Sequence, residues 1–368
     1  YMVQGEDSVL QFRAHEPFVP ASTLKILTSL FALKTLGKEF RFETHFFLDK
    51  DNNLYIKGYG DPFLTSESLL QIGQELSNRG VRRITSLFLD DSSFELDSQV
   101  ADTPSANPYD APNGALAVNF NALPIHVGAD GSISSGEPQT PLLPMMDQIG
   151  QKSPPGTYRI NVSAHHGSRH LGAPLHYAGE LFISLFDQAG IVVERGFSGK
   201  RVPEELSPIY IHYGTHPLVE IVRACLKYSN NFIANQLFLT VGISYFGLPA
   251  TWEKSRRAMD IFSRKILTGP HHQLRVVEGS GLSRDNQVSA ATLIKILSHF
   301  SPYGDLLPIE HNLLLKTGTL EDVFCYAGYI LENGGLVPIA ILLNQERNSR
   351  DQLVELLSHT WLQRMQAQ

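Results

Sequence analysis

The sequence lacks the features that mark several common classes of protein. Its only cysteines are Cys225 and Cys325, and two thiols cannot supply a four-cysteine zinc site or an iron–sulfur cluster. No run approaches the roughly 18 consecutive apolar residues of a membrane span. The 30 basic and 37 acidic residues give a formal charge of −7, without the clustered lysine and arginine that bind nucleic acid. These absences argue against a metal-cluster protein, an integral membrane protein and a nucleic-acid-binding protein.

The two cysteines lie far apart in the chain, so their spacing does not tell whether they pair. We expect two free, partly buried thiols, because a free cysteine packs like a small hydrophobic residue. The sequence begins without a basic segment followed by an apolar one. Either the protein is cytosolic, or a signal peptide and some mature sequence have been removed.

What the sequence does contain is enough apolar material for a folded core. Hydrophobic residues make up 42% of the 368 positions, and at about 150 residues per domain the length predicts two or three domains. The spacing of apolar residues predicts helices and strands along most of the chain. Helices are predicted over 22–36, 65–78, 175–189, 216–242, 252–267, 290–300 and 353–365, and strands over 8–12, 41–60, 84–89, 116–120, 158–162, 325–331 and 336–343, the last two as a hairpin.

Ser22-Thr23-Leu24-Lys25 opens the predicted helix 22–36. Residues three apart share one face of a helix, so the amine of Lys25 can reach the hydroxyl of Ser22. A serine becomes a nucleophile when a nearby base takes its proton, and a partly desolvated lysine can serve as that base. The helix N-terminus adds backbone N–H groups that favour a developing oxyanion. Alone, the pattern has an ordinary interpretation as an N-cap serine before an exposed lysine.

Two further short segments carry candidate chemistry. Ser229-Asn230-Asn231 lies within the predicted helix pair 216–242 and, alone, is also typical of a polar helix junction. Lys316-Thr317-Gly318-Thr319 follows three leucines and is typical of a strand that carries a lysine and two hydroxyls. The glycine in this strand would allow another backbone to approach closely. The alternative is an edge strand with solvated polar residues.

Ser-x-x-Lys on a helix, Ser-x-Asn and then Lys-Thr-Gly on a strand resembles the motif set of penicillin-binding proteins and class A β-lactamases. The chain as a whole resembles the D-alanyl-D-alanine carboxypeptidase/endopeptidase family, the low-molecular-mass class C penicillin-binding proteins. The interval 229 − 22 = 207 residues between the two serines is far longer than in class A β-lactamases. The likeness also rests on Pro20-Ala21-Ser22-Thr23-Leu24-Lys25, Gly60-Asp61-Pro62, Asp91-Ser92-Ser93-Phe94, Ala111-Pro112-Asn113-Gly114-Ala115 and Gly279-Ser280-Gly281-Leu282-Ser283-Arg284-Asp285-Asn286.

The resemblance implies an α/β (α+β) fold. It implies a β-lactamase/transpeptidase-like catalytic domain with an antiparallel five-stranded sheet between helix layers, formed by residues 1–43 and 212–368. Residues 44–211 would form an inserted, mostly β accessory region. This insert is shorter than in the larger members, so we expect its innermost domain to be reduced or absent.

The resemblance also assigns the chemical steps. Ser22 would attack the carbonyl of a D-Ala-D-Ala bond and form an acyl-enzyme, and Lys25 would accept its proton. Ser229 would relay a proton to the leaving amine, and Asn231 would hold either Lys25 or the substrate amide.

The strand motif would bind the end of the substrate. Lys316, Thr317 and Thr319 would bind the terminal carboxylate, with Gly318 between the two threonines. The backbone N–H groups of Ser22 and Thr319 would form the oxyanion hole.

No metal or organic cofactor is expected. His166 and His170 lie in a Gly/Ser-rich loop, and His271 and His272 follow a Gly-Pro pair, so we interpret both groups as loop residues. The expected partners are peptidoglycan stem peptides, with β-lactam antibiotics as covalent inhibitors. The expected location is the periplasm, or more generally outside the cytoplasm, with the signal peptide absent from this chain.

Two other functions stay open. A serine β-lactamase would share the three motifs, but no Glu-x-x-Leu-Asn element for water activation is present. A non-catalytic module that senses penicillin or peptidoglycan would need a route for its signal. The sequence leaves open carboxypeptidase or endopeptidase preference, the third residue of the stem peptide, and the oligomeric state.

Overall fold

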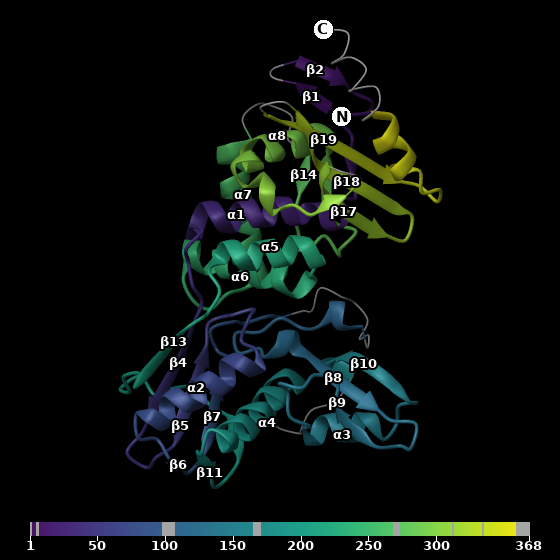
Figure 1. Ribbon diagram of the computed structural model, residues 1–368. Helices are drawn as coiled ribbons and strands as arrows, with labels where there is room; N and C mark the ends of the chain where they lie inside the picture. The colour runs from purple at the N-terminus through teal and green to yellow at the C-terminus, as the bar shows by residue number, and fades with distance from the viewer. Residues whose placement is uncertain are drawn as a thin grey trace. The chain divides into compact units, whose positions relative to one another are not determined.

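The computed structural model describes residues 2–4, 7–97, 107–164, 171–267, 273–310, 313–332 and 335–357 (Figure 1). The chain divides into two compact units. Unit 1 comprises Tyr1–Lys38, Val219–Phe246 and Trp252–Gln368, and unit 2 comprises Glu39–Leu218 and Gly247–Thr251.

Unit 1 is built on a six-stranded sheet whose pairings are antiparallel. We expected five strands, and the structure adds a two-residue strand, β16, at one edge. The central hairpin of β18 and β19 is present as predicted, whereas its Asn333-Gly334 turn lies outside the described residues. In spatial order the strands are β16 (Ile309–Glu310), β17 (Leu313–Leu320), β18 (Val323–Glu332), β19 (Gly335–Asn344), β1 (Met2–Gln4) and β2 (Asp7–Leu10).

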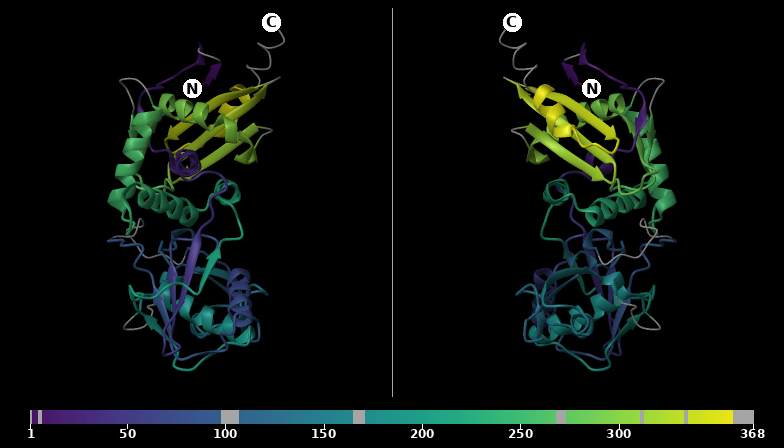
Figure 2. Two further views of the ribbon diagram at one scale, coloured as in Figure 1. Left: turned by 90° about the vertical axis from the view of Figure 1, so that its left-hand side faces the viewer. Right: turned by 90° about the vertical axis from the view of Figure 1, so that its right-hand side faces the viewer.

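Helices cover both faces of this sheet (Figures 1 and 2). On one face, Tyr329 of β18 donates a hydrogen bond to the carbonyl of Leu297 in α8 at 2.6 Å. On the other face, Val354 of a helical segment over 350–357 packs in a cluster with Tyr326 and Ile330. Residues 358–365 of the predicted helix over 353–365 lie outside the described residues. The principal helices of unit 1 are α1 (Lys25–Leu36), α5 (Leu218–Tyr228), α6 (Asn231–Phe246), α7 (Trp252–Ile266) and α8 (Ala290–Phe300).

The burial of each helix follows from its sequence. Helix α1 is apolar on nearly all sides and is buried over Lys25 to Leu33, as expected for a central helix. It ends at Gly37, whose φ of 86° suits a residue without a Cβ. Helix α7 has a charged face and buries Trp252, Met259 and Phe262 at helical spacing. Phe262 packs against Phe31 of α1, with ring centroids 5.0 Å apart.

Unit 2 is mixed rather than mostly β. Helices α2 (Ser66–Asn78) and α4 (Ala173–Gln188) pack with its strands in one hydrophobic core. A five-stranded sheet and a three-stranded antiparallel sheet make up most of its strand content. These sheets contain β4 (Glu43–Leu48), β5 (Leu54–Gly58), β7 (Leu87–Asp90), β12 (Phe197–Gly199) and β13 (Tyr210–Tyr213) in the first, and β8 (Ala122–Val127), β9 (Ile133–Ser135) and β10 (Gly156–Asn161) in the second.

The predicted strand over 116–120 is wrong. Asn119–Asn121 instead form a short 3-10 turn in which all three residues have positive φ. The side chain of Asn119 stabilises this turn by accepting from the backbone N–H of Ser66 at 2.9 Å and donating to the hydroxyl of Tyr177 at 3.0 Å. Asparagine tolerates such a backbone, and its side chain competes with strand pairing.

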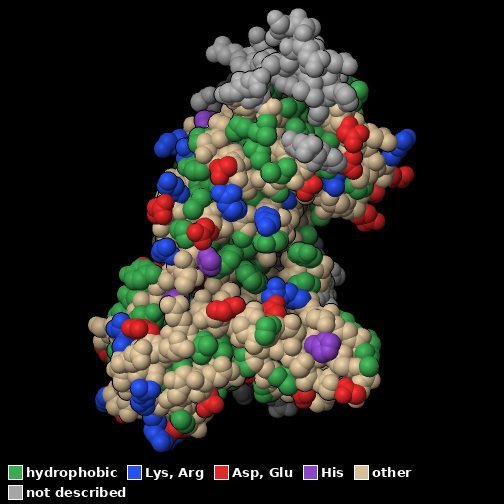
Figure 3. Space-filling model, viewed as in Figure 1, with side chains coloured by type: hydrophobic (Ala, Val, Ile, Leu, Met, Phe, Trp, Pro, Cys, Tyr) green, Lys and Arg blue, Asp and Glu red, His purple; other side chains and the backbone are tan. Residues whose placement is uncertain are grey.

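Charged side chains of both signs are exposed on one face of the molecule. On the face drawn in Figure 3, blue lysine and arginine side chains lie among red aspartate and glutamate side chains. None of the described helices is long and apolar enough to cross a membrane.

Candidate active site

Ser22 and Lys25 lie side by side at the start of the first helical segment of unit 1. Ala21–Leu24 form a 3-10 helix that continues directly into α1. Residues three apart are eclipsed in a 3-10 helix, and Lys25 Nζ lies 2.9 Å from Ser22 Oγ. Ala21, just before the serine, has a φ of 47°, a left-handed conformation that is strained for alanine. The backbone therefore turns sharply to place the hydroxyl beside the amine.

Lys25 is fully buried and makes two more hydrogen bonds. Its Nζ donates to Asn231 Oδ1 and to the carbonyl of Ser280, both at 2.7 Å. Burial lowers the pKa of Lys25 from its usual value to about 8, partly opposed by Cys225 and Glu278, which raise it. A lysine with a pKa near neutrality can accept and return a proton under ordinary conditions.

A second buried lysine, Lys316, lies on strand β17 and pairs with Ser229. Its Nζ lies 2.9 Å from Ser229 Oγ and 2.8 Å from the carbonyl of Thr317. Burial, with the nearby charge of Lys25, lowers the pKa of Lys316 to about 7. Ser229 has a φ of 52° and connects α5 to α6, so the turn between these helices presents its hydroxyl to the lysine.

Strand β17 has an open backbone edge next to this lysine. The N–H of Leu315 donates to Pro308, on the side of β16. Because every second residue of a strand directs its backbone groups to the same side, Thr317 and Thr319 also direct theirs to that side. Among the described residues, no strand pairs with them there. A Cβ at Gly318 would lie 2.7 Å from the carbonyl of Pro20, so glycine lets the segment before Ser22 approach the strand.

The structure thus gathers the predicted residues into one site. Ser22, Lys25 and Asn231 are connected by hydrogen bonds, as are Ser229 and Lys316. The two groups are close enough for the charge of Lys25 to lower the pKa of Lys316. The remaining predicted residues, Thr317, Gly318 and Thr319, follow Lys316 along the same strand.

Arg350 is a residue of this site that the sequence did not reveal. Its Nη1 donates to the carbonyl of Gly318 at 3.0 Å and to Thr319 Oγ1 at 2.7 Å. The guanidinium stacks over the ring of Tyr326, 4.7 Å from its centroid. It lies in a polar segment after the last strand, where no motif distinguishes it from its neighbours.

The segment Gly279–Asn286 forms a wall of the site. Gly281 has a φ of +84°, and a Cβ there would lie 1.9 Å from the carbonyl of Ala21, so only glycine fits against the turn before Ser22. Glu278, just before this segment, is buried beneath it and was not singled out from the sequence. In the sequence, the position of Glu278 next to a glycine-rich stretch was the one feature that could have drawn attention to it.

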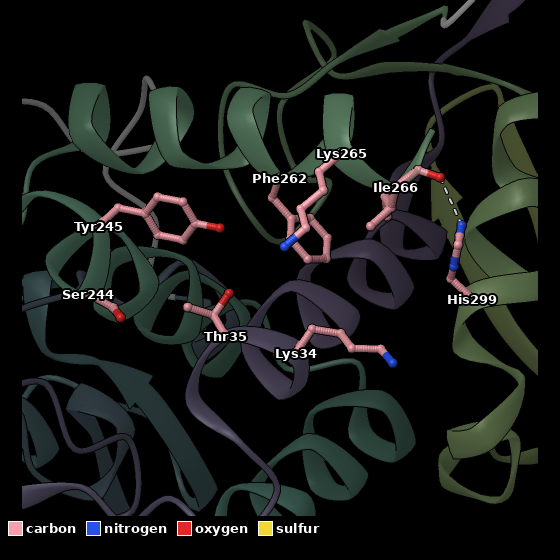
Figure 4. Close-up of a pocket in the computed structure, with 8 residues that line it drawn as sticks. All are labelled: Lys34, Thr35, Ser244, Tyr245, Phe262, Lys265, Ile266 and His299. Carbon is pink, nitrogen blue, oxygen red and sulfur yellow. Dashed lines mark hydrogen bonds between the residues drawn. The ribbon is translucent and has the colours of Figure 1, made fainter. Parts of the chain in front are cut away.

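Other candidate sites do not share these residues. A pocket of 630 Å³ in unit 1 is lined by Lys34, Lys265, His299 and neighbouring residues, and none of the predicted site residues lines it (Figure 4). His166, His170, His271 and His272 lie outside the described residues. In the described part of the chain, no cluster of His, Cys, Asp and Glu has the geometry to hold a metal.

The two cysteines are free and buried, in agreement with the sequence prediction. Cys225 lies on α5 near Lys25, and burial raises its pKa to about 11. Burial also raises the pKa of Cys325 to about 12. Burial thus disfavours the charged thiolate form of both cysteines.

Comparison with known proteins identifies the family. Residues 2–154 and 155–306 match the model of the D-Ala-D-Ala carboxypeptidase 3 (S13) family. The chain belongs to this family. The match confirms the resemblance drawn from the motifs, although the matched residues end before strand β17.

Relatives of this S13-family chain match most of its length. The D-alanyl-D-alanine carboxypeptidase DacB of Haemophilus influenzae is 24% identical over 380 residues, covering 86% of this chain and 78% of the relative. The D-alanyl-D-alanine carboxypeptidase of Actinomadura sp. is 24% identical over 401 residues, covering 89% and 74%.

Solved structures confirm the fold of this S13-family chain. Penicillin-binding protein 4 of Haemophilus influenzae has a TM-score of 0.77 at 21% identity, covering 96% of this chain and 93% of that one. A penicillin G-acylated predatory endopeptidase of Bdellovibrio bacteriovorus has a TM-score of 0.53 at 15% identity, covering 96% and 86%. The chain is thus a peptidase-family hydrolase with the fold of a penicillin-binding protein.

Proposed function

We propose that Ser22 is the nucleophile of a serine DD-peptidase that cleaves D-Ala-D-Ala bonds in peptidoglycan stem peptides. The observation that carries this proposal is the 2.9 Å contact between Ser22 Oγ and the buried amine of Lys25. This pairs a hydroxyl with a base whose pKa of about 8 lies near neutrality. A nucleophile and base within hydrogen-bond reach are the minimum requirement for covalent catalysis.

The acylation step uses these two residues and two backbone donors. Ser22 Oγ bonds to the peptide carbonyl carbon while its proton moves to Lys25 Nζ. The N–H groups of Ser22 and Thr319 stabilise the oxyanion, since strand β17 directs the backbone of Thr319 to its open edge. The peptide C–N bond then breaks, and Ser229 relays the proton held by Lys25 to the leaving amine of D-Ala, so that Lys25 is neutral again. Water then attacks the ester while Lys25 takes its proton and returns it to Ser22 Oγ, which releases the shortened peptide and restores Ser22.

The substrate's terminal carboxylate is bound at the strand side of the site. Lys316 provides a cation next to the hydroxyls of Thr317 and Thr319, a donor set suited to a carboxylate. Recognition of a free chain end favours carboxypeptidase activity. β-Lactams that carry a carboxylate would bind in the same place and acylate Ser22.

We assign the catalytic domain to the unit that contains Ser22 and an accessory function to the inserted residues 44–211. We also place the protein outside the cytoplasm, in the periplasm, because its proposed substrate is part of the cell wall. Both assignments follow from the proposed reaction.

Replacement of the nucleophile tests the proposal. Wild-type protein should gain the mass of a penicilloyl group and should release D-Ala from a D-Ala-D-Ala peptide. Ser22→Ala should do neither while staying folded, because the helix that contains Ser22 has no side-chain capping hydrogen bond to lose. A penicilloyl adduct on the folded Ser22→Ala variant would exclude Ser22 as the nucleophile. Rapid turnover of the penicillin by wild type would instead indicate a β-lactamase.

A further inference from the structure

Glu278 is a buried carboxylate that the proposed reaction does not use. Its side chain is 2% exposed. One oxygen accepts from the backbone N–H and the hydroxyl of Ser280 at 2.7 and 2.6 Å. The other accepts from the N–H groups of Gly281 and Ser283 and from Asn286 Nδ2, at 2.8, 3.3 and 2.6 Å. Five donors converging on two oxygens form the environment of an ionised carboxylate, which can only accept.

These bonds fix a loop that is also tied to the helices around it. The carbonyl of Gly279 accepts from Thr28 Oγ1 on α1 at 2.6 Å, and its N–H donates to Asn235 Oδ1 on α6 at 2.7 Å. Between these ties and the Glu278 carboxylate, the carbonyl of Ser280 points at Lys25 Nζ. The loop therefore delivers one acceptor to the proposed base.

The number of acceptors around Lys25 determines where its lone pair lies. Its amine meets three oxygens, those of Ser22, Asn231 and Ser280. A neutral amine has two N–H bonds and one lone pair. If both N–H bonds are directed to Asn231 and Ser280, the lone pair faces Ser22 Oγ, ready to take its proton.

We propose that Glu278 is a positioning residue for this reaction: through the loop it holds, it keeps the Ser280 carbonyl on Lys25 and thereby aims the lone pair of Lys25 at Ser22. The inference rests on the proposed function of Ser22 and Lys25. Glu278 would also act through its charge. A fixed negative charge beside Lys25 favours the protonated amine and so raises the pKa of Lys25.

The charged and titratable groups that act on Lys25 come from three sides. Glu278 in the loop raises the pKa of Lys25, as does Cys225 on α5. Lys316 on β17 is the opposing positive group, close enough for the charge of Lys25 to lower its pKa. Burial raises the pKa of Cys225 itself to about 11. Glu278 is thus the carboxylate among the groups that raise the pKa of Lys25.

The test is the pH profile of acylation by a penicillin, measured on Glu278→Gln. The substituted amide lacks the charge and presents donors where acceptors are needed, so the rate at the wild-type optimum should fall about tenfold as the lone pair loses its alignment. Without the negative charge, the pKa of Lys25 falls, so the optimum should also move to lower pH, by about half a unit or more. Glu278→Asp, which retains the charge, should restore the wild-type optimum.

The matched control is Glu253→Gln, which changes an exposed glutamate of α7 and should leave both the rate and the optimum unchanged. A folded Glu278→Gln with a wild-type rate, or with a reduced rate at an unshifted optimum, overturns the inference. If Glu278→Gln does not fold, Asn286→Ala removes one donor from the carboxylate, and acylation should slow several-fold without a change in penicillin affinity. A wild-type acylation rate for folded Asn286→Ala overturns the inference equally. Failure of wild-type protein to acylate at all would instead refute the proposed function.

Discussion

The helix side and the strand side of the candidate site each hold a buried lysine, and they hold it differently. Lys25 is surrounded by three oxygen acceptors, drawn from the helical turn of Ser22, from α6 and from the loop after Glu278. Lys316 meets a hydroxyl and a neighbouring carbonyl, on a strand whose edge is open among the residues described. The first environment restricts the direction of a lone pair, whereas the second leaves room for a ligand. The same residue type is therefore suited to the proposed proton transfer on one side and to the proposed anion binding on the other.

The largest effect on acylation is expected from replacing Lys25, on the helix side of the site. Lys25→Ala removes the proposed base, and loss of a general base typically slows a reaction about 10²–10⁴-fold. The first-order acylation rate constant should fall by that factor, whereas penicillin affinity should change little. Lys316→Ala should do the reverse, weakening affinity more than the rate constant.

Single-turnover acylation over a range of penicillin concentrations separates the two parameters. Lys34→Ala on the exposed face of α1 is the matched control for both variants. A wild-type acylation rate constant in Lys25→Ala would assign proton abstraction to another residue.

A smaller effect is expected from replacing Thr317, on the strand side of the site. Thr317→Val keeps the shape and strand preference of the residue but removes its hydroxyl. A hydrogen bond to a charged group is worth about 1.5–3 kcal/mol, so kcat/KM on a D-Ala-D-Ala peptide should fall roughly tenfold to a hundredfold. Activity on the terminally amidated peptide should be low in wild type and barely altered. Thr35→Val, elsewhere on α1, is the control; equal losses on both substrates would show that Thr317 does not bind the carboxylate.

The smallest expected effect concerns Arg350, behind the same strand. Its contact with Thr319 Oγ1 at 2.7 Å occupies a lone pair of that hydroxyl and leaves the O–H free to donate. Arg350→Gln should reduce kcat/KM several-fold, mainly through KM, with Arg347→Gln as the control. Combining it with Thr319→Val should add little further loss if Arg350 acts through Thr319. Fully additive losses would contradict that coupling.

Much of unit 1 was predictable from local patterns. The spacing of Ser22 and Lys25 needed only helical geometry, and β18 and β19 were marked by two apolar runs. Residues that tertiary packing brings to the site from other parts of the chain showed no comparable pattern in the sequence. Glu278 and Arg350 contact motif residues from segments without a pattern of their own.

Unit 2 shows where local patterns fail. The apolar residues before Asn119 suggested a strand, but the asparagine's side-chain contacts with Ser66 and Tyr177 favour a turn. Those partners are distant in sequence, so periodicity could not reveal them. The predicted strand over 84–89 is likewise divided into β6 (Arg83–Ile84) and β7, which pair with different neighbours.

The central claim is that acylation needs a neutral Lys25 and a charged Lys316 in the same molecule. Their pKa values of about 8 and about 7 have opposite consequences as pH rises: Lys25 gains its lone pair through about 8, and Lys316 loses its charge through about 7. The competent form is therefore most abundant between the two values. The most direct measurement is the second-order rate constant for acylation of wild-type protein by a carboxylate-bearing penicillin from about pH 5 to 10, a range that spans both transitions. A bell-shaped profile with its maximum between about pH 7 and about pH 8 is predicted, and a rate constant that is flat or still rising above about pH 9 would contradict the account.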